Sequence, residues 1–456
     1  MKRTSDLDPS KVIVTSFVLA ALVGAALLKL PGATAEGRPL SWLDAFFMAA
    51  SAVCVTGLSV INIGTDLTRF GQNVILVLMQ IGGLGIMTFS VFFQLLATGR
   101  ASFMSRLSVG LEPDSMKMRS LLDVLVFVLL MTLSFELLGA GLLFMEFRNL
   151  HSFSEAVYSA VFHAVSAFCN AGFGLYADSA MSFRTQTLVP MTLMFLIAAG
   201  GIGYMIINEI RLWLWATVIK RERFRLSLHS RICFVGTAGL ILFGTLLFWL
   251  LERGNQLDGM TPVQQVINSM FLAVTSRTAG FNMVDTGLLT GASLFLLIIY
   301  MFIGACPGSA AGGIKIPTLA VLLALSKDQI KGRNMASVFA RKFPAPIVAR
   351  ALGIFAAAFI SLTVCTLLLQ VTENAGVAYK TAPRGFLDLL FEATSAFGTV
   401  GLSTGITPLL SQASKGLIIL LMFAGRVGPL TLGIAIMQRK FSGPKFEYVE
   451  EEIIIG

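Results

Sequence analysis

Charged residues are scarce in this chain of 456 residues, because Asp, Glu, Lys and Arg together make up only 13% of it. Soluble domains carry about 25% charged residues. The hydrophobic fraction is 55% and the mean hydropathy is +0.81. This composition excludes a soluble multidomain enzyme. A lipid bilayer therefore sets the expected element lengths, since a helix needs about 20 apolar residues to cross it.

Cysteine and histidine are also scarce. The five Cys are an odd number with no CxxC pair, and the three His share no ligand spacing. These absences argue against a disulfide framework and against a metal site of the zinc type. The sequence also lacks an HExxH motif, paired catalytic carboxylates and a Walker loop. We therefore predict that the protein is not an enzyme, has no catalytic residues and has no nucleotide site in this chain.

Apolar runs long enough to span a membrane occur eight times. They are Val12–Leu30, Gln72–Thr98, Ser120–Phe147, Thr187–Ile219, Ile232–Leu251, Leu288–Leu325, Ile347–Val371 and Gly416–Met437. Within each successive pair lies a shorter stretch with Ser, Thr and Gly, at 41–61, 154–174, 262–282 and 384–404. Such stretches are too short to cross and are typical of re-entrant half-helices. The sequence predicts an all-α integral membrane protein with eight transmembrane helices and four re-entrant half-helices.

The distribution of Lys and Arg predicts the orientation. With these eight spans, 21 basic residues fall on one side of the membrane, including both termini, and nine fall on the other. The richer side is expected to be cytoplasmic. We therefore predict a multi-pass plasma-membrane protein with both termini in the cytoplasm and the half-helices open to the outside. The net charge of +9 then reflects topology, and nucleic-acid binding is a poor explanation of it.

Each short stretch contains one Gly in a matching context. The four segments are SAVCVTGL with Gly57, SAFCNAGF with Gly172, VTSRTAGF with Gly280 and SAFGTVGL with Gly401. The chain thus predicts four tandem units of helix, half-helix, loop and helix. We place the units at residues 1–99, 100–219, 220–326 and 327–456.

A lone Gly in a membrane helix is usually a point of close packing. Four Gly at matched positions after matched half-helices favour a different interpretation. Gly permits the backbone angles that turn successive carbonyls toward one axis, and a ring of carbonyl oxygens can replace the hydration shell of an alkali cation. The predicted carbonyl donors are Val55, Thr56, Gly57, Asn170, Ala171, Gly172, Thr278, Ala279, Gly280, Thr399, Val400 and Gly401. They would surround a pseudo-fourfold ion pathway.

The sixth span is interrupted by helix-breaking residues between 301 and 315. Gly disfavours a helix interior by about 1 kcal/mol and Pro by about 3 kcal/mol. Two interpretations remain open, a Pro kink in a structural helix and a flexible constriction below the filter. For the second, the gate residues are Gly304, Pro307, Gly308, Ser309, Gly312, Gly313 and Lys315. Lys315 is also compatible with simply marking the start of the inner helix.

Three further charged residues lie where charge is costly, by about 2.5–3.5 kcal/mol for a basic residue in a span. Arg426, in AGRVGPL of the last span, is predicted to oppose the gate segment and repel cations. Arg277, in the third pore loop, is expected to support filter carbonyls or to reach external water. Glu392, in the fourth half-helix, is expected behind the filter, either bonding filter backbone or as a neutral buried acid.

The four SAxxxxG-type loops, one per unit, resemble those of the Trk/Ktr/HKT superfamily of potassium transporters over nearly the whole chain. The ending FEYVEEEIIIG and the lack of extra N-terminal helices are similar to the KtrB branch, the ion-conducting membrane subunit. In that family a Gly at the position of Gly57 goes with potassium selectivity and a Ser with sodium preference. The Gly-rich break matches the intramembrane gate loop of the family, and Arg426 matches its lone basic pore residue.

The resemblance implies potassium uptake, with potassium as substrate and sodium as a second candidate ion that stimulates transport. It also implies a homodimer and a cytoplasmic, nucleotide-binding regulatory ring of the KtrA type. The basic loops 219–231 and 326–350 either dock such a partner or only enforce topology, and the segment Glu447–Glu452 with the Ile residues after it suits a dimer contact. The alternative function is an alternating-access cation:potassium symporter with a midplane site.

Overall fold

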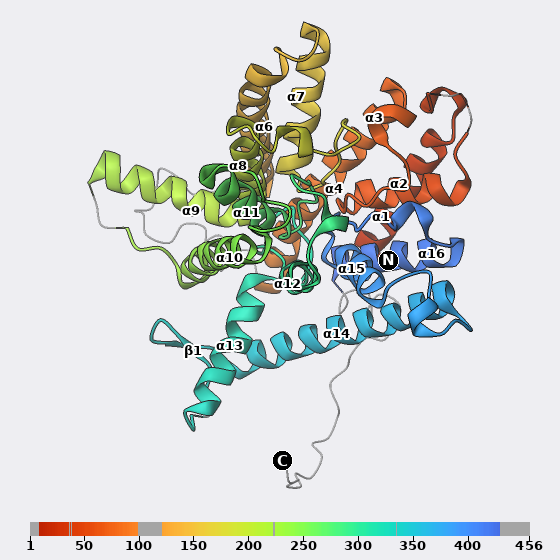
Figure 1. Cartoon of the computed structure of the whole chain (residues 1–456). Coiled ribbons are helices and arrows are strands. Elements are labelled where there is room, and N and C mark those ends of the chain that lie inside the picture. The colour runs from red at the N-terminus through yellow and green to blue at the C-terminus, as the bar shows by residue number, and fades with distance from the viewer. Residues whose placement is uncertain are drawn as a thin grey trace, which may run out of the picture.

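The computed structural model describes residues 9–35, 37, 39–98, 121–221, 224–333 and 335–428. Within these ranges, named strands are confined to one antiparallel pair, β1 (Ser337–Val338) and β2 (Arg341–Lys342). The rest of the regular structure is helical (Figure 1). The predicted cytoplasmic loop around residues 100–119 and the predicted dimer contact at Glu447–Glu452 lie outside the described residues.

Helices occupy the eight predicted spans as far as the structure describes them, and residues 429–437 of the last span lie outside the described residues. They are α1 (Pro9–Leu28), α4 (Arg69–Thr98), α6 (Leu121–Phe147), α8 (Leu188–Ile202), α10 (Leu228–Glu252), α12 (Gly291–Phe302), α14 (Ala345–Asn374) and α16 (Gln412–Val427). Among the described residues, three helical stretches are by themselves long and apolar enough to cross a membrane, in α6, α10 and α14. A bent helix pair that begins with α8 makes a fourth.

The four predicted half-helices are confirmed. They are α2 (Trp42–Val53), α7 (Phe153–Phe168), α11 (Pro262–Thr275) and α15 (Phe386–Gly398), with 12 to 16 residues each. At a rise of about 1.5 Å per residue they are roughly 18–24 Å long, which is shorter than a hydrocarbon core of about 30 Å. Their starts are encoded locally. Ser41 caps α2 by accepting the N–H of Asp44, and Thr261 forms a capping box with Gln264 at α11.

Short elements complete the description. They are α3 (Ile63–Asp66), α9 (Tyr204–Leu214), α13 (Ile316–Ile330), a π-helical turn η3 (Trp215–Lys220), and the 3-10 turns η1 (Pro31–Ala33), η2 (Met181–Phe183), η4 (Thr286–Leu288), η5 (Tyr379–Thr381) and η6 (Thr407–Leu409).

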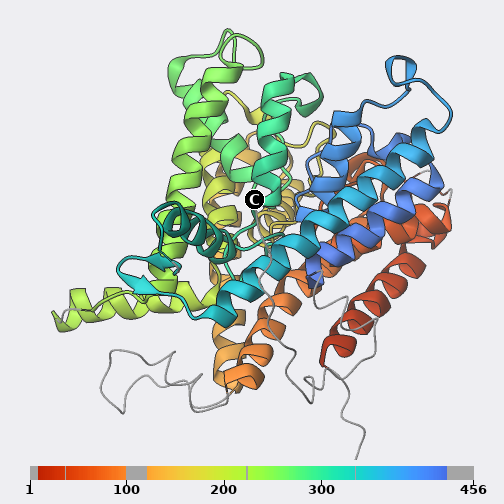
Figure 2. The same ribbon diagram turned by 90° about the horizontal axis from the view of Figure 1, so that it is seen from below.

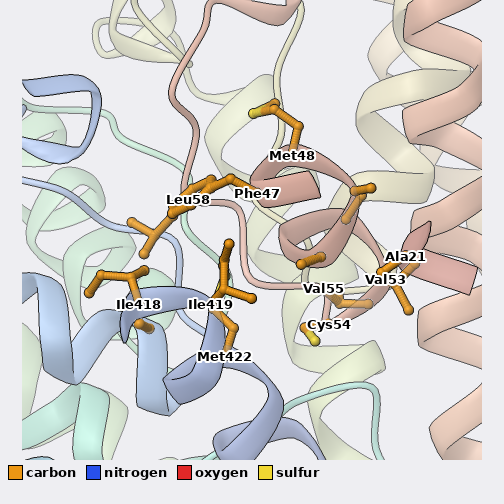
Figure 3. Packing of buried hydrophobic residues seen from close by; sticks show 14 of the residues in the cluster. Ala21, Phe47, Met48, Val53, Cys54, Val55, Leu58, Ile418, Ile419 and Met422 are labelled. Carbon is orange, nitrogen blue, oxygen red and sulfur yellow. The ribbon is translucent and has the colours of Figure 1, made fainter. Parts of the chain in front are cut away.

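The helices of the four units pack in a closed circuit. Helix α4 contacts α6 and α7, α8 contacts α11, and α12 contacts α15. The circuit closes where α16 of the last unit packs against α2 of the first. Figure 3 shows Ile418, Ile419 and Met422 of α16 beside Leu58 and Val55 in the loop after α2. An ion pair across the same contact joins Lys415 Nζ to Asp44 Oδ1 at 2.7 Å.

The predicted span Thr187–Ile219 is not one continuous helix. Helix α8 ends at Ile202, and the chain then bends by 100° into α9 and η3. Helix α9 extends sideways from the bundle (Figures 1 and 2). The physical reason is Gly203, whose φ of +90° is incompatible with a continuous right-handed helix.

Candidate functional site: four loops around one axis

The loops that follow the four half-helices share an unusual backbone. In each loop the residue two positions before the aligned Gly has a positive φ, and so does the Gly itself. These angles are 55° at Val55, 58° at Asn170, 69° at Thr278 and 50° at Thr399, and 94°, 69°, 79° and 93° at Gly57, Gly172, Gly280 and Gly401. A left-handed conformation costs a non-Gly residue about 1–2 kcal/mol. The same cost recurs in all four loops, and such recurring backbone strain is typical of functional sites.

The aligned Gly residues meet around a common axis, and each faces the next unit. A Cβ built on any of them would lie less than 3.0 Å from a backbone carbonyl oxygen, which real Cβ atoms do not tolerate. Gly57 faces the carbonyl of Ala171, Gly172 that of Ala279, Gly280 that of Val400, and Gly401 that of Thr56. The direction of contact is the same in every unit, and the circuit returns to its start. We call this arrangement the four-loop ring.

Buried hydroxyl groups at the ends of the half-helices hold the ring. Ser51 Oγ accepts the N–H of Gly57 at 3.2 Å and donates to the carbonyl of Leu58 at 2.7 Å. In the fourth unit Ser395 Oγ accepts the N–H of Gly401 at 3.1 Å. The third unit has Val274 at this position, and there Thr275 Oγ1 donates to the carbonyl of Phe281 at 2.8 Å. The ring is therefore only quasi-symmetric.

The side chain nine residues before the aligned Gly supports the outer end of the loop in three units. His163 Nε2 accepts the N–H of Leu175 at 3.3 Å, and Met48 Sδ accepts from Ser59 Oγ at 3.4 Å. Glu392 is completely buried, and its carboxylate accepts from Ser403 Oγ, the N–H of Thr404 (3.2 Å) and Thr407 Oγ1 (2.7 Å). Of the two interpretations of Glu392, the geometry fits the one in which its side chain forms hydrogen bonds with the loop. The groups it binds belong to the segment that follows Gly401.

Replacing Glu392 with Ala will leave the three donors of Ser403, Thr404 and Thr407 without their shared acceptor. Each buried donor left unsatisfied costs about 1–3 kcal/mol, so we expect the melting temperature of the detergent-solubilised protein to fall by several degrees. Glu392→Gln keeps one carbonyl acceptor and is expected to lose about half as much. A matched control is Glu146→Ala near the end of α6, since no hydrogen bond to the Glu146 side chain occurs among the described residues. Equal melting temperatures for Glu392→Ala and this control would contradict the role of Glu392.

The predicted break in the sixth span is confirmed, because α12 ends at Phe302 and α13 begins at Ile316. We call residues 303–315 the break segment. Its backbone pairs with the bend between α8 and α9 rather than with itself alone. The N–H groups of Cys306 and Ala310 donate to the carbonyls of Gly201 (3.0 Å) and Gly200 (3.2 Å), and the N–H of Tyr204 donates to the carbonyl of Gly308 (3.2 Å). Two broken helices therefore satisfy each other's backbone groups, as irregular backbone at membrane depth requires.

The break segment lies directly against the four-loop ring. A Cβ on Gly312 would clash with Thr399 Oγ1, and one on Gly313 would touch Gly398. A Cβ on Gly304 would meet the carbonyl of Gly312 across the segment. The close approach explains why Gly occupies positions 304 and 312, and a φ of +65° explains Gly at 313.

The remaining predicted gate residues shape the segment from within. Gly308 has a φ of +72° and packs on the ring of Tyr204. Ser309 Oγ donates to the carbonyl of Cys306 at 2.6 Å, and the carbonyl of Pro307 lies against Gly203.

Two cations, the half-buried Lys315 and the buried Arg426, bind the carbonyls of the break segment. Lys315 Nζ donates to the carbonyl of Gly312 at 3.2 Å and to that of Ala311. Arg426 is 5% exposed; its Nη1 donates to the carbonyl of Ala310 and its Nη2 to that of Gly82 on α4 at 2.7 Å. Arg426 thus connects the break segment to the first unit. The predicted opposition of Arg426 to this segment corresponds to a direct contact in the structure.

Arg277 was predicted to support the loop carbonyls, but its side chain contacts a different helix. Its Nη2 donates to Thr237 Oγ1 on α10 at 3.3 Å, and the described hydrogen bonds of its guanidinium include none to a loop carbonyl. The side chain is 6% exposed, so reaching external water is also excluded. Comparison of the four Gly-containing segments correctly predicts that Arg277 lies in the third loop. The direction of its side chain toward α10 depends on tertiary packing.

Sequence reasoning missed a second set of matched Gly residues. Gly82, Gly200 and Gly425 each lie against the last turn of the half-helix in their own unit, where a Cβ would clash with the carbonyl of Val53, Phe168 or Phe397. The available signal was Gly in QIGG, AAGG and FAGR, 24 to 28 residues after the aligned Gly. These residues let the inner helices approach the ring closely.

Replacing Gly203 with Ala will displace the break segment, because the added Cβ meets the carbonyl of Pro307 and a positive φ is strained for Ala. We expect Cys306, completely buried in the native protein, to react about tenfold faster with a membrane-permeant maleimide. The measurement uses a chain in which Cys306 is the only Cys. The control is Gly239→Ala in α10, where a Cβ meets nothing within 4 Å. Equal labelling rates in the two variants would contradict the pairing of the two breaks.

Comparison with known proteins decides the family. The model of the family TrkH, described as cation transport protein, matches residues 5–444. The chain belongs to the TrkH family. The family resemblance predicted from the loops is confirmed, and so is the prediction that the chain is not an enzyme, since members of the TrkH family are transport proteins.

Relatives of this TrkH-family chain match it end to end. It is 36% identical over 451 residues to Ktr system potassium uptake protein B of Bacillus subtilis, covering 98% of this chain and 97% of that one. It is 34% identical over 453 residues to potassium/sodium uptake protein NtpJ of Enterococcus hirae, covering 99% and 98%. The crystal structure of TrkH from Vibrio parahaemolyticus has the same fold, with a TM-score of 0.74 at 19% identity over 95% of this chain and 86% of that one.

Proposed function

We propose that this chain carries potassium ions into the cell through the four-loop ring, which acts as the selectivity filter. The closed circuit of contacts among Gly57, Gly172, Gly280 and Gly401 carries this proposal. Four loops with the same alternation of backbone angles present carbonyl oxygens around one axis, the arrangement that replaces the hydration shell of an alkali cation. The names of the relatives, which include potassium uptake and potassium/sodium uptake, agree in substrate class.

The half-helices add to the electrostatics of this pathway. Each of them ends immediately before its loop, so its C-terminal carbonyl end is next to the ring. A helix C-terminus carries a partial negative charge of about half an elementary charge. Four such ends favour a dehydrated monovalent cation without a fixed carboxylate in the path. The units 1–99, 100–219, 220–326 and 327–456 are our proposed boundaries for the four quarters.

The break segment is proposed as the gate. It lies against Thr399 and Gly398 of the ring, and it is held by Lys315 and Arg426, whose positive charges oppose a passing cation. Opening requires that these hydrogen bonds to the segment are released. Once these hydrogen bonds are released, the backbone of the segment is free to move because it contains four Gly residues, Gly304, Gly308, Gly312 and Gly313.

Regulation is proposed to come from a partner, because the sequence contains no nucleotide motif. The name of the Bacillus subtilis relative, Ktr system potassium uptake protein B, describes one component of a system with several. This name supports a KtrA-type, nucleotide-binding ring on the cytoplasmic side. The chain is proposed to act as a homodimer in the plasma membrane, with both termini in the cytoplasm and with sodium stimulating potassium uptake.

Radioactive rubidium flux into liposomes that hold the purified chain tests the proposal. With an outward potassium gradient, we expect uptake that external potassium inhibits and that equal concentrations of sodium and lithium do not. Flux that rises steadily with an imposed membrane potential supports a gated pathway. Saturating flux that strictly requires a second cation would instead support the alternating-access symporter. Absence of rubidium uptake with sodium uptake intact would overturn the potassium assignment.

A further inference from the structure

A groove with cationic and apolar lining lies beside helix α9, away from the ring. Its volume is about 770 Å³. Its walls come from the end of α9, from the loop that leads into α10, from the first turn of α10, and from strand β2. The lining includes Trp213, Phe224, Arg225, Leu226, Arg231 and Arg341. Figure 2 shows α9 and the β1–β2 hairpin on the same side of the bundle.

The three guanidinium groups of the groove are exposed and concentrated. Arg231 lies over the ring of Phe339, with 4.7 Å from its Cζ to the ring centroid, and this contact fixes its direction. The acidic residue Glu209 contacts Ser227, which lines the groove. Its carboxylate accepts from the N–H and Oγ of Ser227 and from Ser230 Oγ at the start of α10. Within the described part of the chain, no ion pair neutralises Arg225, Arg231 or Arg341.

The position of the groove matches the polar surface of a bilayer. Helix α10, which is long and apolar enough to span, begins at Leu228, and α14, another such helix, begins at Ala345. The Arg residues therefore lie within a few residues of the ends of two spans. Beside them, Trp213 and Leu214 of α9 and Val218 and Ile219 of η3 expose 38–69% of their surface. Aromatic and basic residues at this level are typical of the interface, and the apolar side chains suit acyl chains.

A second groove on the same side provides a contrast. It measures about 570 Å³ and is lined by Lys327, Lys331 and Arg333, but Asp328 lies among them. Ser337 Oγ donates to Asp328 Oδ2 at 2.6 Å, and this hydrogen bond lowers the pKa of the carboxyl, so the site keeps a negative charge at neutral pH. The groove at α9 has three cations and no acid in its lining, which favours an anion there.

We infer that the groove formed by Trp213, Arg225, Arg231 and Arg341 binds the phosphate headgroup of an anionic phospholipid. The guanidinium groups contact the phosphate, and the acyl chains run along the exposed apolar face of α9 and η3. Planar guanidinium groups suit phosphate oxygens because they donate two parallel hydrogen bonds. The basic side of the membrane is also the side where anionic lipids concentrate. This inference is independent of the proposed potassium function.

Quenching of tryptophan fluorescence by brominated lipids tests it. The reporter chain keeps Trp213 and has Phe at Trp42, Trp215 and Trp249. The fluorescence of Trp213 is measured in vesicles of phosphatidylcholine and phosphatidylglycerol in which one of the two lipids is brominated. We expect the quenching to show that phosphatidylglycerol binds beside Trp213 at least about tenfold more tightly than phosphatidylcholine. Arg225→Gln, Arg231→Gln and Arg341→Gln together should abolish this preference.

The matched control removes three charges from the other groove, by Lys327→Gln, Lys331→Gln and Arg333→Gln. It should leave the lipid preference of Trp213 unchanged. Native mass spectrometry of the intact chain provides a second measurement, with phosphatidylglycerol retained by the wild type and lost from the first triple variant. An equal preference in both triple variants, or no preference in the wild type, would overturn the inference. If the first triple variant lost binding to a nucleotide-binding subunit but kept the lipid preference, the groove would be a protein interface, and the inference would also be overturned.

Discussion

Replacing Gly57 with Ser will lower the preference for potassium over sodium by at least about tenfold. Gly57 has a φ of +94°, and a Cβ there would be driven into the carbonyl of Ala171 in the next unit. The left-handed backbone alone costs Ser about 1–2 kcal/mol, and 1.4 kcal/mol already corresponds to a factor of ten. Relief of the clash must move the carbonyl that faces the pathway. Rubidium flux in liposomes, with sodium and potassium as competitors, measures the change.

Gly405→Ser separates backbone strain from intrusion into the ring. Gly405 has a φ of +92°, nearly the value of Gly57, but a Cβ there meets nothing within 4 Å. We expect this variant to lose stability without losing selectivity. If Gly405→Ser and Gly57→Ser changed the ratio of potassium to sodium flux equally, contact within the ring would not be the cause.

Replacing Arg426 with Gln will raise basal flux by about tenfold or more and weaken its control. At an effective dielectric constant of about 20, a unit charge roughly 6 Å from a passing cation opposes it by about 3 kcal/mol. The substitution removes this charge and also the connection between the carbonyls of Ala310 and Gly82. Flux at fixed membrane potential measures the rise.

Two companion variants make the result specific to Arg426. Arg426→Lys keeps the charge but a single ammonium group replaces the two-armed guanidinium contact, so we expect intermediate flux. Arg211→Gln removes a charge from α9, where Arg211 donates to Asn208 at 2.8 Å and lies over Phe127. It should leave flux near the wild-type value. A rise as large in Arg211→Gln as in Arg426→Gln would show that general surface charge, rather than the gate contact, controls flux.

The features that sequence patterns predicted correctly are those written within one unit. The half-helices have caps such as Ser41 and Thr261 at their starts and a Gly-containing turn at their ends, so a stretch of about 20 residues encodes each one. The break after Phe302 is likewise encoded by local Gly and Pro. These signals depend on backbone preferences of consecutive residues, which can be evaluated without a tertiary structure.

Features that depend on contact between units could not be predicted in this way. The sequence of Gly200–Gly203 resembles ordinary small-residue packing. The hydrogen bonds that stabilise its bend, from Ala310 to the carbonyl of Gly200 and from Cys306 to that of Gly201, depend on the tertiary structure. The partner of Arg277 is Thr237, 40 residues away on another helix. The direction of the circuit around the ring could not be predicted either, because each contact joins residues more than 100 positions apart.

The position of a bound thallium ion tests the central claim most directly, because thallium substitutes for potassium and scatters X-rays anomalously. In crystals of the wild-type chain with thallium, the account predicts an anomalous peak on the axis enclosed by Gly57, Gly172, Gly280 and Gly401, and excess sodium should not displace it. In Gly57→Ser the peak should weaken or vanish. A thallium peak found only at a midplane site outside the ring, with none on the axis, would contradict the account.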